Sequence, residues 1–281
     1  MICEIYYKDS WHEPDAKIFS STNRGIKYGD GFFESMTAFN NKICFLEDHF
    51  ERIKKTASIL EFDVEKAGLT KDLLNQTLSH FIKSNQLNAC AVRVQFIRSY
   101  GSKYTPASMD CDFFIEFSDK TSSKFSAGLK LEKAGLYKEH LIQKNNTLSP
   151  LKTSNSLLYV LAKSYCIKNE LNEVILFNNN LEIAELSSSN IYLDMGDKVL
   201  TPPLASGCLD GIIRRQLLKP EAKEHFNIQE FDIFESDLEN AVAIYGSNTS
   251  MGIFCIQQIG HKTYTSGQSV ALTEFINSKI S

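Results

Sequence analysis

Three stretches between residues 150 and 215 carry side chains that could do chemistry. Lys152 lies in a polar setting of threonine, serine and asparagine, just before an apolar run with helical spacing. Glu185 follows a short predicted strand and precedes three serines. Gly211 then opens a second run with helical spacing. An amine, a carboxylate and a helix N-terminus could together bind an anion and carry out nucleophilic or acid–base chemistry.

The lysine can act as a nucleophile only if it loses its proton near neutral pH. That requires partial desolvation or a cationic neighbour. Lys152 lies between Leu151 and a predicted helix start, where the positive end of the helix dipole disfavours its charge. A solvated surface lysine is the alternative interpretation.

An anion such as phosphate is held in proteins by arginine, backbone N–H groups and helix N-termini. The N–H groups of Ile212 and Ile213 fit this pattern, and the hydroxyl-rich turn 246–250 could donate more. Arg52 could supply charge, because it lies beside the apolar stripe of a predicted helix rather than opposite it. Ordinary loops and a snorkelling arginine are the alternatives.

An amine, an anion site and a carboxylate are together the groups that can bind pyridoxal 5′-phosphate. A carboxylate beside the pyridine nitrogen favours its protonated form, and the ring then accepts electrons from the substrate. Glu185 could have this role, or it could be an ordinary turn residue.

Composition excludes several classes of protein. The net charge of −4, with both signs mixed along the chain, gives no general attraction to nucleic acid or anionic membrane. No apolar run reaches the ~20 residues of a membrane span, and Glu4 lies where a signal peptide would be apolar. The seven cysteines show no metal-ligand spacing. We therefore expect a cytoplasmic protein with reduced cysteines and no metal site.

Periodicity predicts an α+β protein. Apolar residues recur at steps of three and four over 46–60, and polar and apolar residues alternate over 89–98. Residues 24–34 are predicted as a glycine-punctuated loop feeding a strand, and Asn40-Asn41 as a hairpin turn. The other predicted helices are 71–83, 154–169 and 210 or 211 to 218, and the other strands are 33–39, 42–45, 112–117, 129–136, 173–177, 190–193, 199–201, 241–245 and 253–259.

A chain of 281 residues is long enough for two domains. The polar stretch 118–128 has no apolar periodicity and is the best linker candidate. We predict an N-terminal α+β domain over 1–118, a linker over 119–125, and a C-terminal α+β domain over 126–281 that carries the lysine.

Six blocks of the sequence come in the order of a known family. The chain resembles the class-IV aminotransferases, the fold-type-IV pyridoxal-phosphate enzymes, which include branched-chain and D-amino-acid aminotransferases and aminodeoxychorismate lyase. The resemblance implies a two-domain fold like that of D-amino-acid aminotransferase, with the cofactor between the domains, and a homodimer. The six blocks are 28–34, 49–52, 152–163, 185–192, 200–204 and 206–215.

The resemblance also implies a role for each matching residue. Lys152 would form the Schiff base with pyridoxal 5′-phosphate and then move the proton of the substrate α-carbon, and Glu185 would hold the pyridine nitrogen. The implied phosphate contacts are Arg52, the N–H groups of Ile212 and Ile213, and Thr249. On the substrate side the implied contacts are Tyr28, Phe33, and Arg93 or Arg98.

The chain departs from the family at three positions. Ile213 replaces a threonine, so the phosphate would rely on backbone N–H groups and Thr249. Asp210 replaces a proline, and we expect its carboxylate to turn away from the phosphate or to cap the helix. Thr37 replaces an arginine, which weakens the prediction of how a substrate carboxylate is bound.

The expected substrate is a small amino acid or an amino-substituted carboxylate. The turn that begins at Asn248 resembles the Asn-Ser-Leu-x-Gly pattern of the lyases more than the Gly-Thr-Ala pattern of the branched-chain enzymes. The sequence therefore favours a 4-amino-4-deoxychorismate lyase-like enzyme over a branched-chain or D-amino-acid aminotransferase. A non-catalytic cofactor-binding protein is the third alternative, which loss of the lysine or the glutamate would have favoured.

Overall fold

The computed structural model describes residues 3–280 and divides into two compact units. Unit 1 comprises the described residues up to Lys124 together with Lys152–Asn155, and unit 2 comprises Phe125–Leu151 and the described residues from Ser156 onward. The limits predicted from sequence assigned residues 152–155 to the C-terminal domain. They lie with unit 1 because their backbone pairs with one of its strands.

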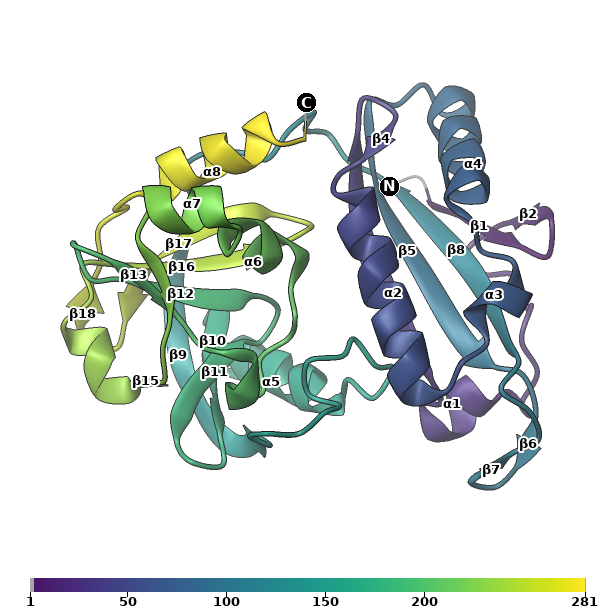
Figure 1. The fold of residues 1–281 in the computed structure, drawn as a ribbon, viewed down its shortest axis with the longest axis horizontal. Coiled ribbons are helices and arrows are strands. Elements are labelled where there is room, and N and C mark those ends of the chain that lie inside the picture. The colour runs from purple at the N-terminus through teal and green to yellow at the C-terminus, as the bar shows by residue number, and fades with distance from the viewer. Residues whose placement is uncertain (1–2, 281) are drawn as a thin grey trace. The chain divides into compact units, whose positions relative to one another are not determined.

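Unit 1 is built on an antiparallel sheet with the strand order β2-β1-β8-β5-β3-β4. Helices α2 and α4 lie over this sheet (Figure 1). The described helices of unit 1 are α1 (Arg24–Tyr28), α2 (Leu46–Leu60), α3 (Val64–Ala67) and α4 (Lys71–Ser84). Its described strands are β1 (Cys3–Tyr7), β2 (Ser10–His12), β3 (Gly31–Phe39), β4 (Lys42–Ile43), β5 (Ala89–Arg98), β6 (Gly101–Ser102), β7 (Thr105–Pro106) and β8 (Cys111–Asp119).

The two long helices of unit 1 confirm the predictions made from apolar spacing. The bounds of α2 are those predicted, and Phe50, Ile53 and Ala57 on its inner face are buried. Helix α4 starts after Thr70, whose side-chain oxygen accepts the N–H of Leu73 as an N-cap. Both helices pack on the apolar face of the sheet to form the core of unit 1.

The Asn40-Asn41 hairpin turn is also confirmed. Both residues have positive φ, 49° and 62°, as a type I′ turn requires. Residues 24–28 differ from the prediction, because they form α1 rather than a loop. Asn23 caps this short helix by accepting the N–H of Ile26.

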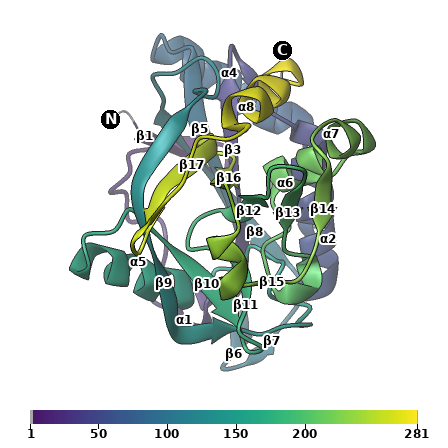
Figure 2. The same ribbon diagram turned by 90° about the vertical axis from the view of Figure 1, so that its left-hand side faces the viewer.

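Unit 2 is built on a mixed sheet organised around one long strand, β9. The order is β14-β13-β12-β16-β17-β9-β10-β11-β15, and Figure 2 labels these strands. Strand β18 is attached to β17. Strand β9 pairs in parallel with β17 and then with β10. The described strands are β9 (Leu129–Ile142), β10 (Glu173–Asn178), β11 (Glu182–Leu186), β12 (Asn190–Asp194), β13 (Val199–Thr201), β14 (Ile228–Glu230), β15 (Ile233–Phe234), β16 (Ala243–Asn248), β17 (Gly252–Ile259) and β18 (Lys262–Thr263). The described helices are α5 (Leu157–Lys168), η1 (Leu204–Ser206), α6 (Ile212–Leu217), α7 (Pro220–His225), η2 (Glu235–Glu239) and α8 (Ser269–Ser278).

The α+β class is confirmed, but several bounds in unit 2 differ from the prediction. Strand β9 continues past the predicted end at 136. Helix α5 starts at Leu157 rather than 154, and Thr153, just before the predicted start, forms a bridge with Phe32. Glu185 lies inside strand β11 rather than in a turn.

The described range, 3–280, contains no helix that is long and apolar enough to cross a membrane. In the same range no cysteine forms a disulfide, and all are buried except the half-buried Cys3. Nor do its His, Cys, Asp and Glu side chains form a group of three that could hold a metal ion.

Leu78 tests the packing of α4 on the sheet. Its side chain is fully buried in the core of unit 1, so Leu78→Ala should lower the free energy of unfolding by about 2–5 kcal/mol. Ile59→Ala on α2 is the matched control, since Ile59 is 41% exposed and should lose far less. Urea titrations followed by circular dichroism measure both, and equal losses would contradict this packing.

Candidate active site

The backbone of Lys152 is fixed by strand pairing in unit 1. The N–H of Phe33 donates to the carbonyl of Lys152 at 2.9 Å, and the N–H of Ser154 donates to the carbonyl of Gly31 at 2.9 Å. Phe32 and Thr153 form the bridge between these two bonds. The backbone beside the lysine is therefore fixed to β3 by an isolated bridge.

The ring of Phe33 contacts two other residues predicted for the site, Lys152 and Arg93. The ammonium of Lys152 lies 4.4 Å from the centre of the Phe33 ring, and the guanidinium of Arg93 lies 3.7 Å from it, both within cation–π range. Arg93 is also paired with Glu116 at 3.4 Å and donates to Gln95 at 3.0 Å. Burial lowers the pKa of Arg93, against the effect of Glu116.

Glu34, the next residue of β3, points to the opposite face, as alternate residues of a strand do. Its carboxylate accepts hydrogen bonds from Nε and Nη2 of Arg52, the former at 3.0 Å, and contacts Nδ1 of His49 at 2.6 Å. All three side chains are buried. Burial alone would raise the pKa of Glu34, but Arg52 and His49 together lower it to about 2. Arg52 is thus held at two of its nitrogens by a buried carboxylate.

Burial also lowers the pKa of His49, so this ring is neutral at pH 7. Its Nε2 is buried and has no hydrogen-bond partner within residues 3–280. Sequence reasoning missed both Glu34 and His49, although the two lie in the blocks 28–34 and 49–52 that carried the resemblance.

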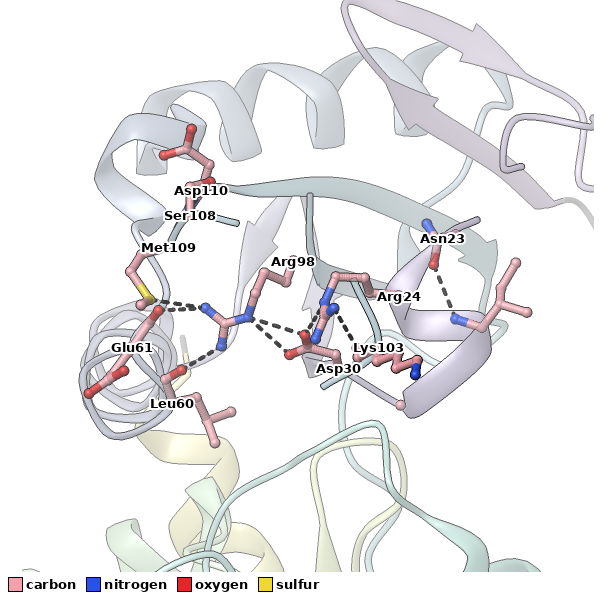
Figure 3. Close-up of polar contacts among 12 residues, drawn as sticks. Asn23, Arg24, Asp30, Leu60, Glu61, Arg98, Lys103, Ser108, Met109 and Asp110 are labelled. Atoms are coloured by element: carbon pink, nitrogen blue, oxygen red, sulfur yellow. Dashed lines mark hydrogen bonds and ion pairs between the residues drawn. The ribbon is translucent and has the colours of Figure 1, made fainter. Parts of the chain in front are cut away.

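Arg98 has a different set of partners from Arg93. Figure 3 shows Asp30 between Arg24 and Arg98, with Nε of Arg98 at 3.1 and 3.2 Å from the two carboxylate oxygens. Arg98 also donates to the carbonyls of Leu60 at 2.7 Å and Glu61 at 2.8 Å, where α2 ends. A buried arginine in these contacts caps α2 and stabilises the fold.

Tyr28 ends α1 beside the hairpin formed by β6 and β7. Its ring lies 5.2 Å from the guanidinium of Arg24 and 5.6 Å from the ring of Tyr104. Arg24 also donates to the carbonyl of Lys103 at 2.9 Å, which ties this hairpin to α1 (Figure 3).

Glu185 is held by two donors within unit 2. The hydroxyl of Tyr159 donates to Oε1 at 2.7 Å, and the N–H of Leu209 donates to Oε2 at 2.9 Å. Glu185 is only 2% exposed. Burial raises the pKa of Tyr159 well above its usual range, with Glu185 adding to the effect, so the hydroxyl stays a donor. Tyr159 carried no signal in the sequence, because a tyrosine on an apolar helix usually belongs to the core.

The peptide of Leu209 also connects Glu185 to the start of α6. The side-chain amide of Asn190 donates to the carbonyl of Leu209 at 2.8 Å, on the other side of the same residue. Gly211 then caps α6, and a Cβ there would lie 2.0 Å from Oδ1 of Asn190. A side chain at this position would displace the amide of Asn190, and Ile212 and Ile213 follow as the buried first residues of the helix.

The turn that contains Thr249 is tied to the same region. Asn248 donates to the carbonyl of Ser188 at 3.2 Å and to Oγ of Ser189 at 2.8 Å, and its own oxygen accepts the N–H of Met251 at 2.7 Å. Because β12 pairs with β16, Asn190 lies opposite Ser247. Unit 2 therefore gathers Glu185, the start of α6 and Thr249 at one end of its strands.

Asp210 forms an ion pair with Arg215. The two carboxylate oxygens accept from Nε at 3.0 Å and Nη2 at 2.8 Å. A guanidinium one turn along α6 thus compensates the acidic residue that replaces the family's proline.

Comparison with known proteins identifies the family. A family model described as Amino-transferase class IV matches residues 31–259, most of the chain. The protein belongs to the class IV aminotransferases.

Curated relatives are similar along almost their whole length. A D-alanine aminotransferase of Bacillus licheniformis is 22% identical over 92% of this chain and 89% of its own. A D-alanine aminotransferase of Staphylococcus epidermidis is 25% identical over 93% of this chain and 90% of its own.

Solved structures share the fold at low identity. A Legionella pneumophila protein assigned as a 4-amino-4-deoxychorismate lyase has a TM-score of 0.82 at 20% identity, covering 95% of this chain and 97% of its own. The branched-chain aminotransferase of Escherichia coli has a TM-score of 0.83 at 19% identity, and the match covers 97% of this chain and 91% of its own. The fold is that of the fold-type-IV enzymes, as predicted.

Class IV aminotransferases depend on pyridoxal phosphate. One structural neighbour, a hypothetical aminotransferase of Mycobacterium tuberculosis, was solved with it bound, and has a TM-score of 0.81 at 14% identity, covering 99% of this chain and 98% of its own. The chain is therefore a pyridoxal-phosphate-dependent enzyme of the aminotransferase and lyase family.

The two arginines of β5 should differ sharply when removed. Arg98→Ala removes one of the two arginines that pair with Asp30 and the buried donor to the carbonyls of Leu60 and Glu61, and it should cost about 3–5 kcal/mol of unfolding free energy. Arg93→Ala removes a 42% exposed side chain and should cost about 1 kcal/mol or less. Denaturant titration tests this, and a larger loss in Arg93→Ala would refute the division of roles.

Glu34 should make stability depend on acid pH. Its pKa is about 2 when folded and 4.5 ordinarily, so its contribution is complete above pH 4.5 and is lost as the pH falls towards 2. Glu34→Gln should cost about 3–5 kcal/mol at pH 7, because it removes the charge from a buried ion pair with Arg52. Urea midpoints measured from pH 7 to pH 2 should show this difference shrinking, and a constant difference would exclude the assignment.

Proposed function

We propose that this chain binds pyridoxal 5′-phosphate through a defined set of its residues. The set contains an amine for the aldehyde, a carboxylate for the ring nitrogen, and an arginine, backbone N–H groups and a hydroxyl for the phosphate. Its members are Lys152, Glu185, Arg52, the N–H groups of Ile212 and Ile213, and Thr249.

Glu185 is the observation that carries the proposal. A carboxylate that is 2% exposed and held in one orientation by two donors is favoured by a positive partner. A protonated pyridine nitrogen is such a partner. The tight turn at Gly211 supports the phosphate end of the set, because the first N–H groups of a helix have no acceptor inside it.

Bound pyridoxal phosphate supplies an aldehyde carbon that reacts with amines and a ring that accepts electrons. Lys152 would hold the aldehyde carbon and would move the proton of the substrate α-carbon. Glu185 would hold the ring nitrogen. Glu34 and His49 fix the position of Arg52, which would bind the phosphate.

Arg93 and Phe33 form the substrate side, next to Lys152. Arg93 is the better partner for a substrate carboxylate, because the donors of Arg98 bind Asp30 and the end of α2. Tyr28 contributes an aromatic ring near the β6–β7 hairpin.

The preferred reaction is a lyase-type cleavage of 4-amino-4-deoxychorismate or a similar amino-substituted carboxylate. Support comes from the turn at Asn248, which resembles the lyase pattern and whose side chain binds both its own turn and Ser188. Transamination of D-alanine or a branched-chain amino acid is the second candidate, favoured by relatives 22–25% identical to this chain.

We further propose a cytoplasmic homodimer. Helix α5 exposes large apolar side chains on one side, with Leu157 69%, Val160 57% and Ile167 81% exposed, and such a stripe is typical of a protein interface. The absence of disulfides in the described range fits a reducing compartment.

Cofactor binding tests the proposal. Purified protein should be yellow, and borohydride should abolish its visible absorbance band. Lys152→Ala should lack the band and lose activity by about a hundredfold or more. Lys163→Ala, which alters another lysine of the same block, is the control and should keep the band. A colourless wild-type protein that takes up no pyridoxal phosphate would refute the proposal.

Product analysis separates the two reactions. With 4-amino-4-deoxychorismate the lyase releases 4-aminobenzoate and pyruvate. An aminotransferase forms a keto acid from D-alanine or leucine only when a keto-acid acceptor is present. Release of 4-aminobenzoate by the wild type but not by Lys152→Ala supports the first candidate, and keto-acid formation alone supports the second.

A further inference from the structure

Tyr159 contacts the glutamate that the proposed function assigns to the ring nitrogen. Its hydroxyl is 2.7 Å from Oε1 of Glu185, while the N–H of Leu209 is 2.9 Å from Oε2. The two oxygens of one carboxylate are thus held by two different elements, helix α5 and the turn before α6. Two donors in these positions fix the rotation of the carboxylate about its Cγ–Cδ bond.

The donor on α5, Tyr159, is held in place by packing. Tyr159 packs against a buried cluster that includes Tyr137, Leu176 and Ala184 together with Ala162 and Cys166 of α5 itself. A tyrosine has few rotatable bonds, so a packed ring holds its hydroxyl in one place. Burial keeps the hydroxyl protonated, and the hydrogen bond runs from tyrosine to carboxylate.

Tyr159 is also close in sequence to the reactive amine. It lies seven residues after Lys152, on the first turn of α5, the helix that follows the lysine segment. The donor side chain is therefore near the lysine in the chain, and its partner Glu185 lies on β11 of unit 2.

We propose that Tyr159 is a positioning residue for the reaction, which holds the Glu185 carboxylate in the orientation that meets the pyridine nitrogen. This inference rests on the proposed function. A hydrogen bond to a buried carboxylate is stronger than one between neutral groups, so its loss should weaken both the contact to the nitrogen and the binding of the cofactor.

The test variant is Tyr159→Phe, which deletes one hydroxyl and keeps the packed ring. The dissociation constant of pyridoxal phosphate should rise about tenfold. With cofactor labelled with ¹⁵N in the ring, the pyridine signal should move from the protonated towards the unprotonated position. Both measurements are independent of turnover.

Two controls make the result specific. Tyr165→Phe alters another partly buried tyrosine on α5, whose ring makes an edge contact with Tyr137, and it should leave both readouts at the wild-type value. In a Glu185→Gln background, Tyr159→Phe should have little further effect, because the group it orients is already changed. Thermal unfolding verifies that each variant is folded.

The outcomes distinguish this inference from the function on which it rests. A wild-type protein that binds the cofactor, with Tyr159→Phe matching it in affinity and ¹⁵N shift, overturns only the role of Tyr159. A wild-type protein that does not bind pyridoxal phosphate overturns the proposed function and the role of Tyr159 together. An equal effect of Tyr159→Phe with and without Glu185 also overturns the role, since the hydroxyl would then act through another group.

Discussion

Charge that is removed from water must be compensated, and the candidate site is arranged around carboxylates that meet this constraint. Glu34 pairs with Arg52 and His49, Asp30 pairs with Arg24 and Arg98, and Glu185 accepts from Tyr159 and Leu209. Each carboxylate fixes groups from different elements, so the same contacts stabilise the fold and orient the side chains that do chemistry.

The three carboxylates have distinct effects on function. Glu34 orients an arginine proposed for the phosphate. Asp30 fixes α1 and the end of α2, and through Arg24 the hairpin beside Tyr28. Glu185 is itself proposed to contact the cofactor, and Tyr159 and Leu209 hold its carboxylate. Asp210, which replaces the family's proline, is compensated locally by Arg215.

Sequence reasoning predicted the elements whose signal is local. Helices α2 and α4, strand β5 and the Asn40-Asn41 turn were predicted because periodicity and turn chemistry act over a few residues. The pairing of 152–155 with β3 could not be predicted this way, because it depends on a partner more than a hundred residues away. The strand around Glu185 was missed because a short apolar run before serines also fits a turn.

For the site, residue types predicted the candidates but not their partners. Arg93 and Arg98 look alike in an alternating strand, and they diverge only through Phe33 on one side and Asp30 on the other. Tyr159 and Glu34 could be identified only from their tertiary contacts, of Tyr159 with Glu185 and of Glu34 with Arg52 and His49. The reaction type remains a proposal, since lyases and aminotransferases share this fold.

Mapping the covalent attachment point tests the central claim most directly. Protein loaded with pyridoxal phosphate, reduced with borohydride and digested should yield one cofactor-modified peptide, and tandem mass spectrometry should locate the modification on Lys152. A modification on another lysine, or one scattered over many, would contradict the account.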